Sequence, residues 1–203
     1  TADCGYEAAK AATTAVVAEG NVGAGAGATV GKSGGAGRAM KGGIGSAAIR
    51  MPDGLIVAAL VAVNAAGDVV DPATGKIVAG VRTQDGKGLA DARLLLASGA
   101  VRQPARLGEN TTLGVVATNA TLTKTQATKV AEMAHDGYAR ALYPAHTMGD
   151  GDTIFAVATA AQAGNADVSR IGALAAQVVA DAIVRAARQA TSIPGYPAAR
   201  DLK

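Results

Sequence analysis

The sequence predicts a mixed α+β fold, and three stretches carry that prediction. Residues 55–64 are apolar on both faces, as in a strand that is covered on each side. Residues 111–118 alternate with the period of a strand, and residues 167–189 carry an apolar stripe at helical spacing. The chain has 203 residues, which fits one domain or one domain processed into two pieces.

The composition allows a large core and argues against several partners. Apolar residues make up 49% of the chain and charged residues 17%, so the chain can bury a sizeable core and is not expected to be disordered. The net charge of +3 is mild, the Lys and Arg residues are scattered, and aromatic residues are only 2%. We therefore expect no nucleic-acid partner.

Cysteine and histidine content gives no sign of a metal site or a disulfide framework. Cys4 is the single cysteine, which excludes an internal disulfide and suits a reducing compartment, so a cytoplasmic protein is predicted. His135 and His146 lack further ligands at metal spacing, so we expect hydrogen-bonded structural histidines. The longest apolar run, residues 55–63, is half of what a membrane helix needs, and no membrane association is expected.

The first third of the chain contains a glycine-rich region that imitates a phosphate-binding loop. Asp3 is a candidate cap for a helix over residues 5–19. Residues 26–33 then satisfy a relaxed phosphate-loop pattern ending in Gly31-Lys32-Ser33. Five glycines follow within residues 34–43, and each would cost a helix about 1 kcal/mol relative to alanine. A nucleotide-binding module is therefore the disfavoured alternative to a glycine-rich strand and loop packed against another backbone.

The next elements are predicted to be strands joined by tight turns. Residues 45–51 and 55–64 read as a pair of strands around the turn signal Pro52-Asp53-Gly54. Asn64 ends the second strand, where an asparagine commonly caps a turn. Residues 69–81 read as a hairpin, and residues 89–97 as a short helix.

A polar, aperiodic segment, residues 101–108, leads directly into the strand that opens at Thr111. If the bond before Thr111 were cut, one residue would carry both a hydroxyl nucleophile and a free amine. Such an amine has an unperturbed pKa of about 7.7–8.0, so it can act as the base that a threonine hydroxyl needs. By its local pattern alone, Thr111 also fits an ordinary β-branched residue at the start of a strand.

The second half of the chain is predicted to be a helix, a strand and a helix. Residues 123–126 have the spacing of a capping box and open a helix to about Leu142. Asp150 and Asp152 precede a strand over residues 153–159 and, two residues apart, would point to the same side. They form either one carboxylate site or an acidic turn. The last helix starts at Asp167 or Ser169 and runs to about Gln189.

Two of these stretches resemble one known family. Residues 110–119, which read NTTLGVVATN, are similar to the start of the small subunit of DmpA-like aminopeptidases and their nylon-oligomer hydrolase relatives. Residues 144–157, which read PAHTMGDGDTIFAV, resemble the same family. The resemblance implies a four-layer αββα sandwich of the N-terminal-nucleophile type. It also implies that residues 1–110 are the C-terminal part of a large subunit and 111–203 a small subunit, forming one domain together, with the front part of the large subunit outside this sequence.

The resemblance further implies a self-activating amide hydrolase. The chain would cut itself between Asn110 and Thr111, and Thr111 would become the N-terminal nucleophile. Asn64 matches the residue that helps to hold the oxyanion. Lys32, Asp150 and Asp152 match residues that orient and tune the nucleophile. No cofactor and no metal are implied.

The implied substrates are small peptides or amide oligomers, including 6-aminohexanoate (nylon-type) oligomers, and the sequence does not choose among them. The implied assembly is a homo-oligomer of processed heterodimers, such as a tetramer. One alternative within self-cleaving enzymes is an acyltransferase like the ornithine acetyltransferases, whose local pattern around the cut is different.

Overall fold

The computed structural model describes residues 2–100 and 110–202. Its centre is a four-stranded sheet in the order β3-β4-β7-β9. The strands are β3 (Gly43–Arg50), β4 (Ile56–Val63), β7 (Leu113–Ala120) and β9 (Thr153–Gln162). β4 runs antiparallel to both β3 and β7, whereas β7 and β9 run parallel.

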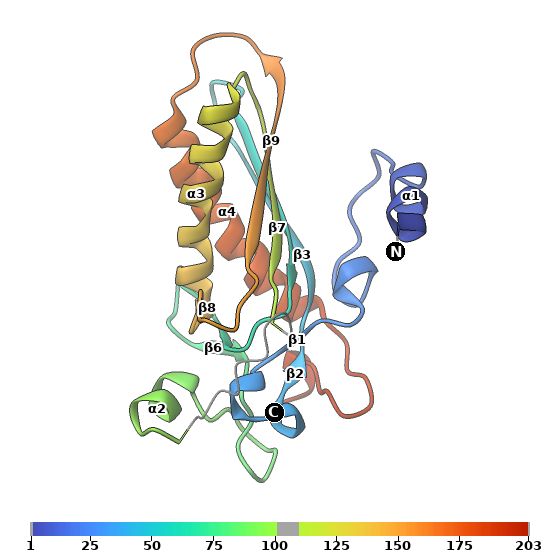
Figure 1. Ribbon diagram of the computed structural model, residues 1–203, viewed down its shortest axis with the longest axis vertical. Helices are drawn as coiled ribbons and strands as arrows, with labels where there is room; N and C mark the ends of the chain where they lie inside the picture. The colour runs from blue at the N-terminus through green and yellow to red at the C-terminus, as the bar shows by residue number, and fades with distance from the viewer. Residues whose placement is uncertain (1, 101–109, 203) are drawn as a thin grey trace.

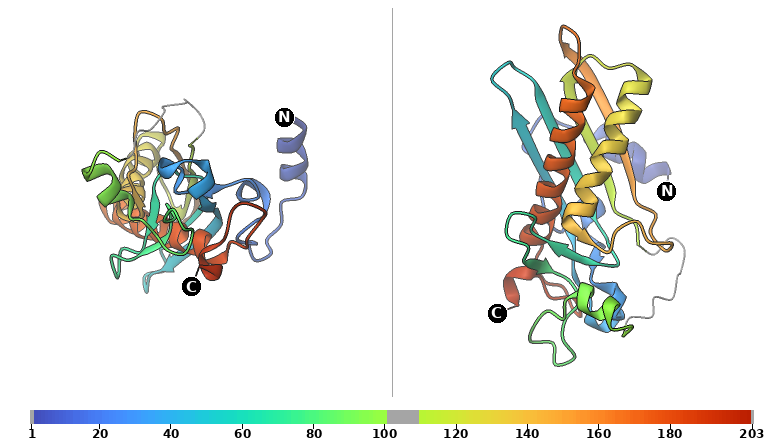
Figure 2. Two further views of the ribbon diagram at one scale, coloured as in Figure 1. Left: turned by 90° about the horizontal axis from the view of Figure 1, so that it is seen from below. Right: turned by 90° about the vertical axis from the view of Figure 1, so that its left-hand side faces the viewer.

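Two long helices cover one face of this sheet. They are α3 (Lys124–Ala141) and α4 (Val168–Gln189), which lie side by side against the strands (Figures 1 and 2). The sheet residues on this face are small or β-branched, and the core between the layers is mainly valine and alanine, with Tyr138 as its largest side chain. The aromatic-poor composition therefore produces a thin, closely packed core.

The opposite face of the sheet carries exposed apolar side chains. Along β7 the burial alternates, with Leu113 and Val115 exposed and Val116 buried. Phe155 and Val157 of β9 continue the exposed set. The described residues thus supply one sheet layer and one helix layer of the sandwich that the family resemblance implies.

Both helices begin with the caps that the sequence predicts. Thr123 and Gln126 form a complete capping box at the start of α3. The Asp167 side chain accepts a hydrogen bond from the backbone of Arg170 and caps α4. The predicted bounds of these two helices are confirmed to within a few residues.

Two smaller sheets lie at one end of the main sheet. One has the order β6-β5-β8 and consists of β5 (Asp68–Val70), β6 (Ile77–Ala79) and β8 (Leu142–Tyr143). The other pairs β1 (Thr29–Val30) with β2 (Met40–Lys41). The hairpin predicted over residues 69–81 is confirmed as β5 and β6, while the sequence did not predict β8.

The first helix is shorter than predicted. Helix α1 spans Ala2–Lys10 and none of its residues is buried, so the prediction of a helix over 5–19 is wrong beyond residue 10. Figure 1 shows α1 standing apart from the body of the molecule. The apolar residues of its predicted face stay exposed, Tyr6 and Val16 among them. A periodic face without a packing partner does not hold a helix of that length.

Helix α2 (Ala92–Ala97) begins three residues later than predicted, because Asp91 caps it. Its start is attached to the small sheet by the buried Asp68, whose two carboxylate oxygens accept the N–H groups of Val81 and Ala92, each at 2.7 Å. Burial raises the pKa of the Asp68 carboxyl above its ordinary value, against the effect of these hydrogen bonds.

Glycine at position 45 sets the distance between the sheet and α4. A Cβ atom there would overlap the carbonyl oxygen of Ala182 and the backbone nitrogen of Ala186. We expect Gly45→Ala to lower the free energy of unfolding by roughly 2–4 kcal/mol, because backbone must move to admit the methyl group. Thermal or urea unfolding checks this, with Gly37→Ala as the matched control, since a Cβ at Gly37 meets nothing within 4 Å. Equal stability of the two variants would contradict the close approach.

Among the helices of residues 2–100 and 110–202, none has the length and apolar content to cross a bilayer.

Candidate active site

Thr111 lies two residues before β7, between the extensions of β4 and β9. The antiparallel register pairs Ala62 of β4 with Leu113, so two further steps along it place Asn64 opposite Thr111. The parallel register pairs Leu113 with Thr153, and the bridge between Asn110 and Asp150 keeps the same offset. Thr111 therefore has Gly151 on one side, and the register of β4, continued past the end of the ladder, would bring Asn64 to the other. The strand was predicted to open at Thr111, whereas its ladder begins at Leu113.

Gly151 contacts both groups that would react in a self-cleavage. A Cβ atom at this position would lie 2.6 Å from Oγ1 of Thr111, so the hydroxyl rests against the bare glycine. The N–H group of Gly151 donates a hydrogen bond of 2.7 Å to the carbonyl oxygen of Asn110. That carbonyl belongs to the bond between Asn110 and Thr111. Gly151 thus packs against the Thr111 hydroxyl and, through its N–H group, polarises the Asn110 carbonyl.

Asp152 is a buried carboxylate directly beside this point. Its Oδ1 accepts the backbone N–H of Thr112 at 2.9 Å, and its side chain is only 7% exposed. Burial raises the pKa of Asp152 above its ordinary value, and the neighbouring Asp150 adds to the rise. The hydrogen bond from Thr112 and the proximity of His146 lower the pKa and so oppose this effect.

Asp150 lies on the same segment but turns partly toward its own loop. Its Oδ2 accepts the backbone N–H of Thr147 at 2.7 Å, while its Oδ1 is buried and has no hydrogen-bond partner among the described residues. Three other buried side-chain atoms nearby share this condition in the described chain: Asn110 Oδ1, Thr112 Oγ1 and Thr147 Oγ1. Since buried polar groups are almost always paired, the site contains polar atoms whose partners are not found among residues 2–100 and 110–202.

Lys32 and Asn64 are in direct contact. The Lys32 ammonium donates to Oδ1 of Asn64 at 2.7 Å and to its backbone oxygen at 3.3 Å. The backbone N–H of Thr29 donates to the same Oδ1 at 3.1 Å. With two donors on Oδ1, the amide nitrogen of Asn64 points to the other side, where an amide can donate to a developing negative charge.

The glycine-rich region does not form a phosphate-binding loop. Gly31 adopts φ = +73° and packs against the backbone at Gly80, and Lys32–Gly34 is a single 3₁₀ turn that no α-helix continues. A phosphate loop needs a helix N-terminus at this point. The geometry supports the predicted tight loop, and the nucleotide-binding alternative loses its structural basis.

The rings of His135, Tyr138 and His146 pack together next to the segment that carries Asp150 and Asp152. The buried Tyr138 donates its hydroxyl to the carbonyl oxygens of Thr112 and Thr153, at 3.2 and 3.3 Å, and burial raises the pKa of its phenol. His135 and His146 lie against each other with ring centroids 5.0 Å apart. Burial lowers the pKa of His135, and His146 adds to that shift. No group of three or more potential metal ligands occurs among the residues that the structure describes.

His146 is a partly exposed neighbour of the buried Asp152. Its Nδ1 lies 3.6 Å from Oδ2 of Asp152, its side chain is 41% exposed, and its backbone adopts the unusual φ of +57°. When the imidazole carries a proton, it favours the ionised carboxylate and lowers the pKa of Asp152.

We therefore expect His146→Asn to raise the pKa of Asp152, so that any activity requiring its carboxylate falls off at a higher pH. The acid limb should move up by roughly half a pH unit, as expected for a partly exposed charge pair. The measurement is the pH dependence of scission between Asn110 and Thr111 in freshly translated protein, where no free amine titrates. His135→Asn serves as control. An unmoved acid limb in the His146 variant would rule out the coupling.

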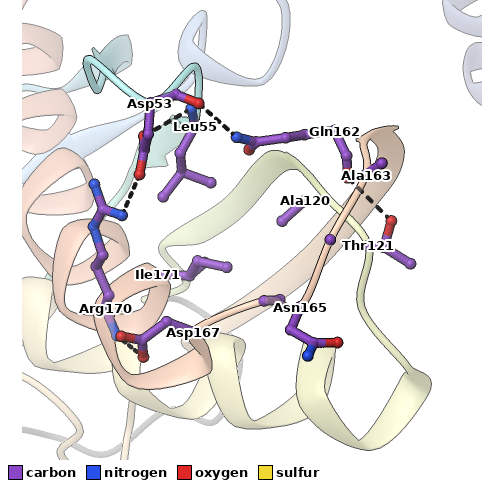
Figure 3. Close-up of a pocket in the computed structure, with 12 residues that line it drawn as sticks. Asp53, Leu55, Ala120, Thr121, Gln162, Ala163, Asn165, Asp167, Arg170 and Ile171 are labelled. Carbon is purple, nitrogen blue, oxygen red and sulfur yellow. Dashed lines mark hydrogen bonds and ion pairs between the residues drawn. The ribbon is translucent and has the colours of Figure 1, made fainter.

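One surface pocket lies at the other end of the sheet and does not belong to this site. Figure 3 shows its lining, which includes Asp53, Ala120, Gln162 and Arg170. Arg170 pairs with Asp53 at 2.5 Å, and Gln162 donates to the Asp53 backbone oxygen. Ala120 ends β7, seven residues after the strand begins at Leu113, or about 23 Å away along an extended chain.

Comparison with known proteins identifies the family. The profile of peptidase family S58 matches residues 2–200. The chain belongs to peptidase family S58. An uncharacterised aminopeptidase of Mycobacterium bovis is 39% identical over 223 residues, which cover 100% of this chain and 61% of that protein. One from Mycobacterium leprae is 38% identical, with 95% of this chain and 55% of that protein covered. This member of family S58 therefore spans 61% and 55% of the length of these two relatives.

A shorter match concerns a hydrolase of 6-aminohexanoate oligomers. A 6-aminohexanoate-oligomer endohydrolase of a Kocuria strain is 31% identical over 96 residues, covering 42% of this chain and 27% of that protein.

Solved structures confirm the predicted fold class. A Burkholderia β-aminopeptidase superposes with a TM-score of 0.59 at 28% identity, over 91% of this chain and 50% of that one. An L-aminopeptidase D-Ala-esterase/amidase from Ochrobactrum anthropi, described as a variant of the Ntn hydrolase fold, gives a TM-score of 0.59 at 21% identity, over 94% and 52%. The latter likeness concerns the fold alone. This S58 chain is thus an α+β protein of the N-terminal-nucleophile type.

The structure brings the sequence-predicted residues together in two groups. Lys32 contacts Asn64, and Thr111 lies beside the segment of Asp150 and Asp152. The register of β4 with β7 joins the groups. Sequence reasoning missed Gly151, whose only signal was a glycine between two acids at the start of a strand. It also missed His146 as a partner of Asp152.

Proposed function

We propose that this protein is a self-processing amide hydrolase of the aminopeptidase type, with Thr111 as its N-terminal nucleophile. The observation that carries the proposal is the double role of Gly151, which packs against the Thr111 hydroxyl and donates to the Asn110 carbonyl oxygen. Family membership supports hydrolysis of amide bonds, and the likeness to aminopeptidases supports substrates with a free amine.

Self-cleavage begins when Oγ1 of Thr111 attacks the Asn110 carbonyl carbon. The bond from that carbon to the Thr111 nitrogen breaks, an ester forms, and the nitrogen takes a proton to become an amine. Water then hydrolyses the ester, leaving a carboxylate on Asn110. Asp152, whose pKa is raised by burial, is the proposed acceptor of the hydroxyl proton, since a raised pKa makes a carboxylate a stronger base.

Scission would add hydrogen-bond donors to the site. The new neutral α-amine of Thr111 carries two N–H groups, in a region where Oδ1 of Asp150 and of Asn110 are buried without partners among the described residues. The processed chain end can therefore donate to acceptors that have no partner in the described part of the uncut chain.

In turnover, Thr111 attacks the carbonyl carbon of a substrate amide, and its own amine accepts the hydroxyl proton. That proton passes to the leaving amine, and water releases the acyl group from the threonine ester. Asn64 donates its amide N–H to the oxyanion. The Lys32 ammonium holds Asn64 and, as a nearby positive charge, lowers the pKa of the Thr111 amine and keeps it neutral.

Substrates of this proposal are small peptides or amide oligomers, and the Kocuria relative extends the range to 6-aminohexanoate oligomers. Assembly into oligomers of processed heterodimers and a cytoplasmic location stay predictions.

Assay of the purified protein with amino-acid amides, dipeptides and a 6-aminohexanoate oligomer tests the proposal. Amine release without any acyl acceptor is the expected result. A rate that depends on an added amine acceptor, with transfer of the acyl group to it, would favour the ornithine-acetyltransferase-like alternative. Absence of both reactions in a protein that is folded and cleaved would overturn the hydrolase assignment.

A further inference from the structure

Lys41 is a fully buried lysine that the proposed mechanism does not use. It lies on β2, opposite Thr29 of β1, and none of its surface is exposed. Its ammonium donates to three backbone oxygens: Gly25 at 2.7 Å, Ala28 at 2.7 Å and Gly42 at 2.9 Å. An ammonium has three donors, so all of them are used.

Burying the charged Lys41 ammonium lowers the stability of the folded state. None of these three partners is a carboxylate, so within the part of the chain that the structure describes it is backbone dipoles that compensate the buried charge. Burial accordingly lowers the pKa of Lys41. Lysine is one of the residues least often fully buried, so its position here calls for a function beyond filling space.

The three hydrogen bonds fix the loop that orients Asn64. Gly25 and Ala28 belong to the turn that precedes β1, and the next residue, Thr29, donates its N–H to Oδ1 of Asn64. Gly42 is packed so closely against the backbone oxygen of Val63 that a Cβ would overlap it. Lys41 therefore joins the loop before Thr29 to the strand end that carries Asn64.

The orientation of Asn64 depends on this loop. Oδ1 accepts from Thr29 and from Lys32, and these two hydrogen bonds set the direction in which the amide nitrogen points. Lys32 is a flexible side chain, whereas the Thr29 donor is backbone and lies where the loop puts it. If the loop shifts, the backbone donor leaves Oδ1 and the amide can rotate.

We propose that Lys41 is a positioning residue for the reaction, holding the loop of residues 25–28 so that Thr29 fixes the Asn64 amide toward the oxyanion. This inference rests on the proposed function. Lys41 touches no reacting atom and acts through Asn64.

The test compares Lys41→Met with Met40→Leu. Lys41→Met keeps the length of the side chain and removes the three donors. Met40 is the neighbouring residue on β2, equally buried, with a sulfur that accepts from Gly80 at 3.3 Å, so its variant perturbs the same strand without touching the loop carbonyls. Rates are expressed per folded molecule, from thermal unfolding curves.

We expect Lys41→Met to lower kcat and the rate of self-cleavage tenfold or more, with KM changed less than threefold, because the lost interaction belongs to the transition state. Hydrogen exchange of residues 25–29 should accelerate in this variant and stay unchanged in Met40→Leu. When Lys41→Met is added to Asn64→Ala, the rate should change less than threefold, since the two residues act as one unit.

If the hydrogen exchange of residues 25–29 is unchanged in Lys41→Met, Lys41 does not hold this loop and the proposal is wrong. A loss of rate that persists undiminished in the Asn64→Ala background would show that Lys41 does not act through Asn64. Wild-type protein that neither cleaves itself nor releases amines would instead remove the proposed function, and the positioning role with it, while the exchange data still decide whether Lys41 holds the loop.

Discussion

Thr111→Ala is expected to give one intact polypeptide without amide hydrolase activity. The variant removes the hydroxyl that attacks the Asn110 carbonyl, so the backbone stays continuous and no N-terminal amine forms. The fold should be retained, because Thr111 lies before the β7 ladder and contributes no backbone pair to it. Gel electrophoresis and an amide assay measure both consequences.

Thr111→Ser is the matched control for this variant. It keeps the hydroxyl and loses only a methyl group, so we expect cleavage to continue, with rates within about tenfold of the wild type. The buried neighbour Thr112 provides a second control, since Thr112→Val should leave cleavage at the same bond. Amide turnover by the Thr111→Ala protein would show that another residue is the nucleophile.

Gly151→Ala is expected to reduce self-cleavage and turnover by a hundredfold or more. The added methyl group would lie 2.6 Å from Oγ1 of Thr111, closer than atoms approach without bonding. Either the hydroxyl moves from its position or the segment carrying Asp150 and Asp152 moves away. In both cases the hydrogen bond from the Gly151 N–H to the Asn110 oxygen changes, and a misplacement of 1 Å can cost two orders of magnitude.

The loss in Gly151→Ala should appear in rates rather than in stability. The glycine is exposed and its φ lies outside the left-handed region, so alanine carries no backbone penalty of its own there. Time courses of self-cleavage, with unfolding curves beside them, separate the two effects, and Gly37→Ala should behave as wild type in both. Full activity of Gly151→Ala would mean that the hydroxyl does not rest against this residue during the reaction.

The sequence predicted best those helices and strands whose spacing of apolar residues follows directly from the faces that they bury. The strand over residues 56–63 is a short run that is apolar on both faces and follows a turn signal, and α4 carries a continuous apolar stripe at helical spacing, so each could be placed from its sequence pattern. The capping box at Thr123 placed the start of α3 to the residue. Two-residue strands such as β8 have no period to detect, and α1 shows that a periodic face lacking a partner overpredicts a helix.

The site was predicted only as a set of residue types. Thr111, Asn64, Lys32, Asp150 and Asp152 came from resemblance to a family, and the sequence offered no means of placing them relative to one another. Their placement depends on strand register, which brings Gly151 against Thr111 and directs the end of β4, where Asn64 follows, toward the same end of β7. Lys41 could not have been predicted, because lysines are normally exposed and only the folded loop supplies its three carbonyl partners.

The most direct test of a self-activating chain is the intact mass of the wild-type protein under denaturing conditions, with N-terminal sequencing of each product. We predict two polypeptides, the smaller beginning Thr-Thr-Leu-Gly at Thr111, and their masses summing to that of the uncut chain plus one water. A single continuous polypeptide from protein that hydrolyses amides would contradict the account.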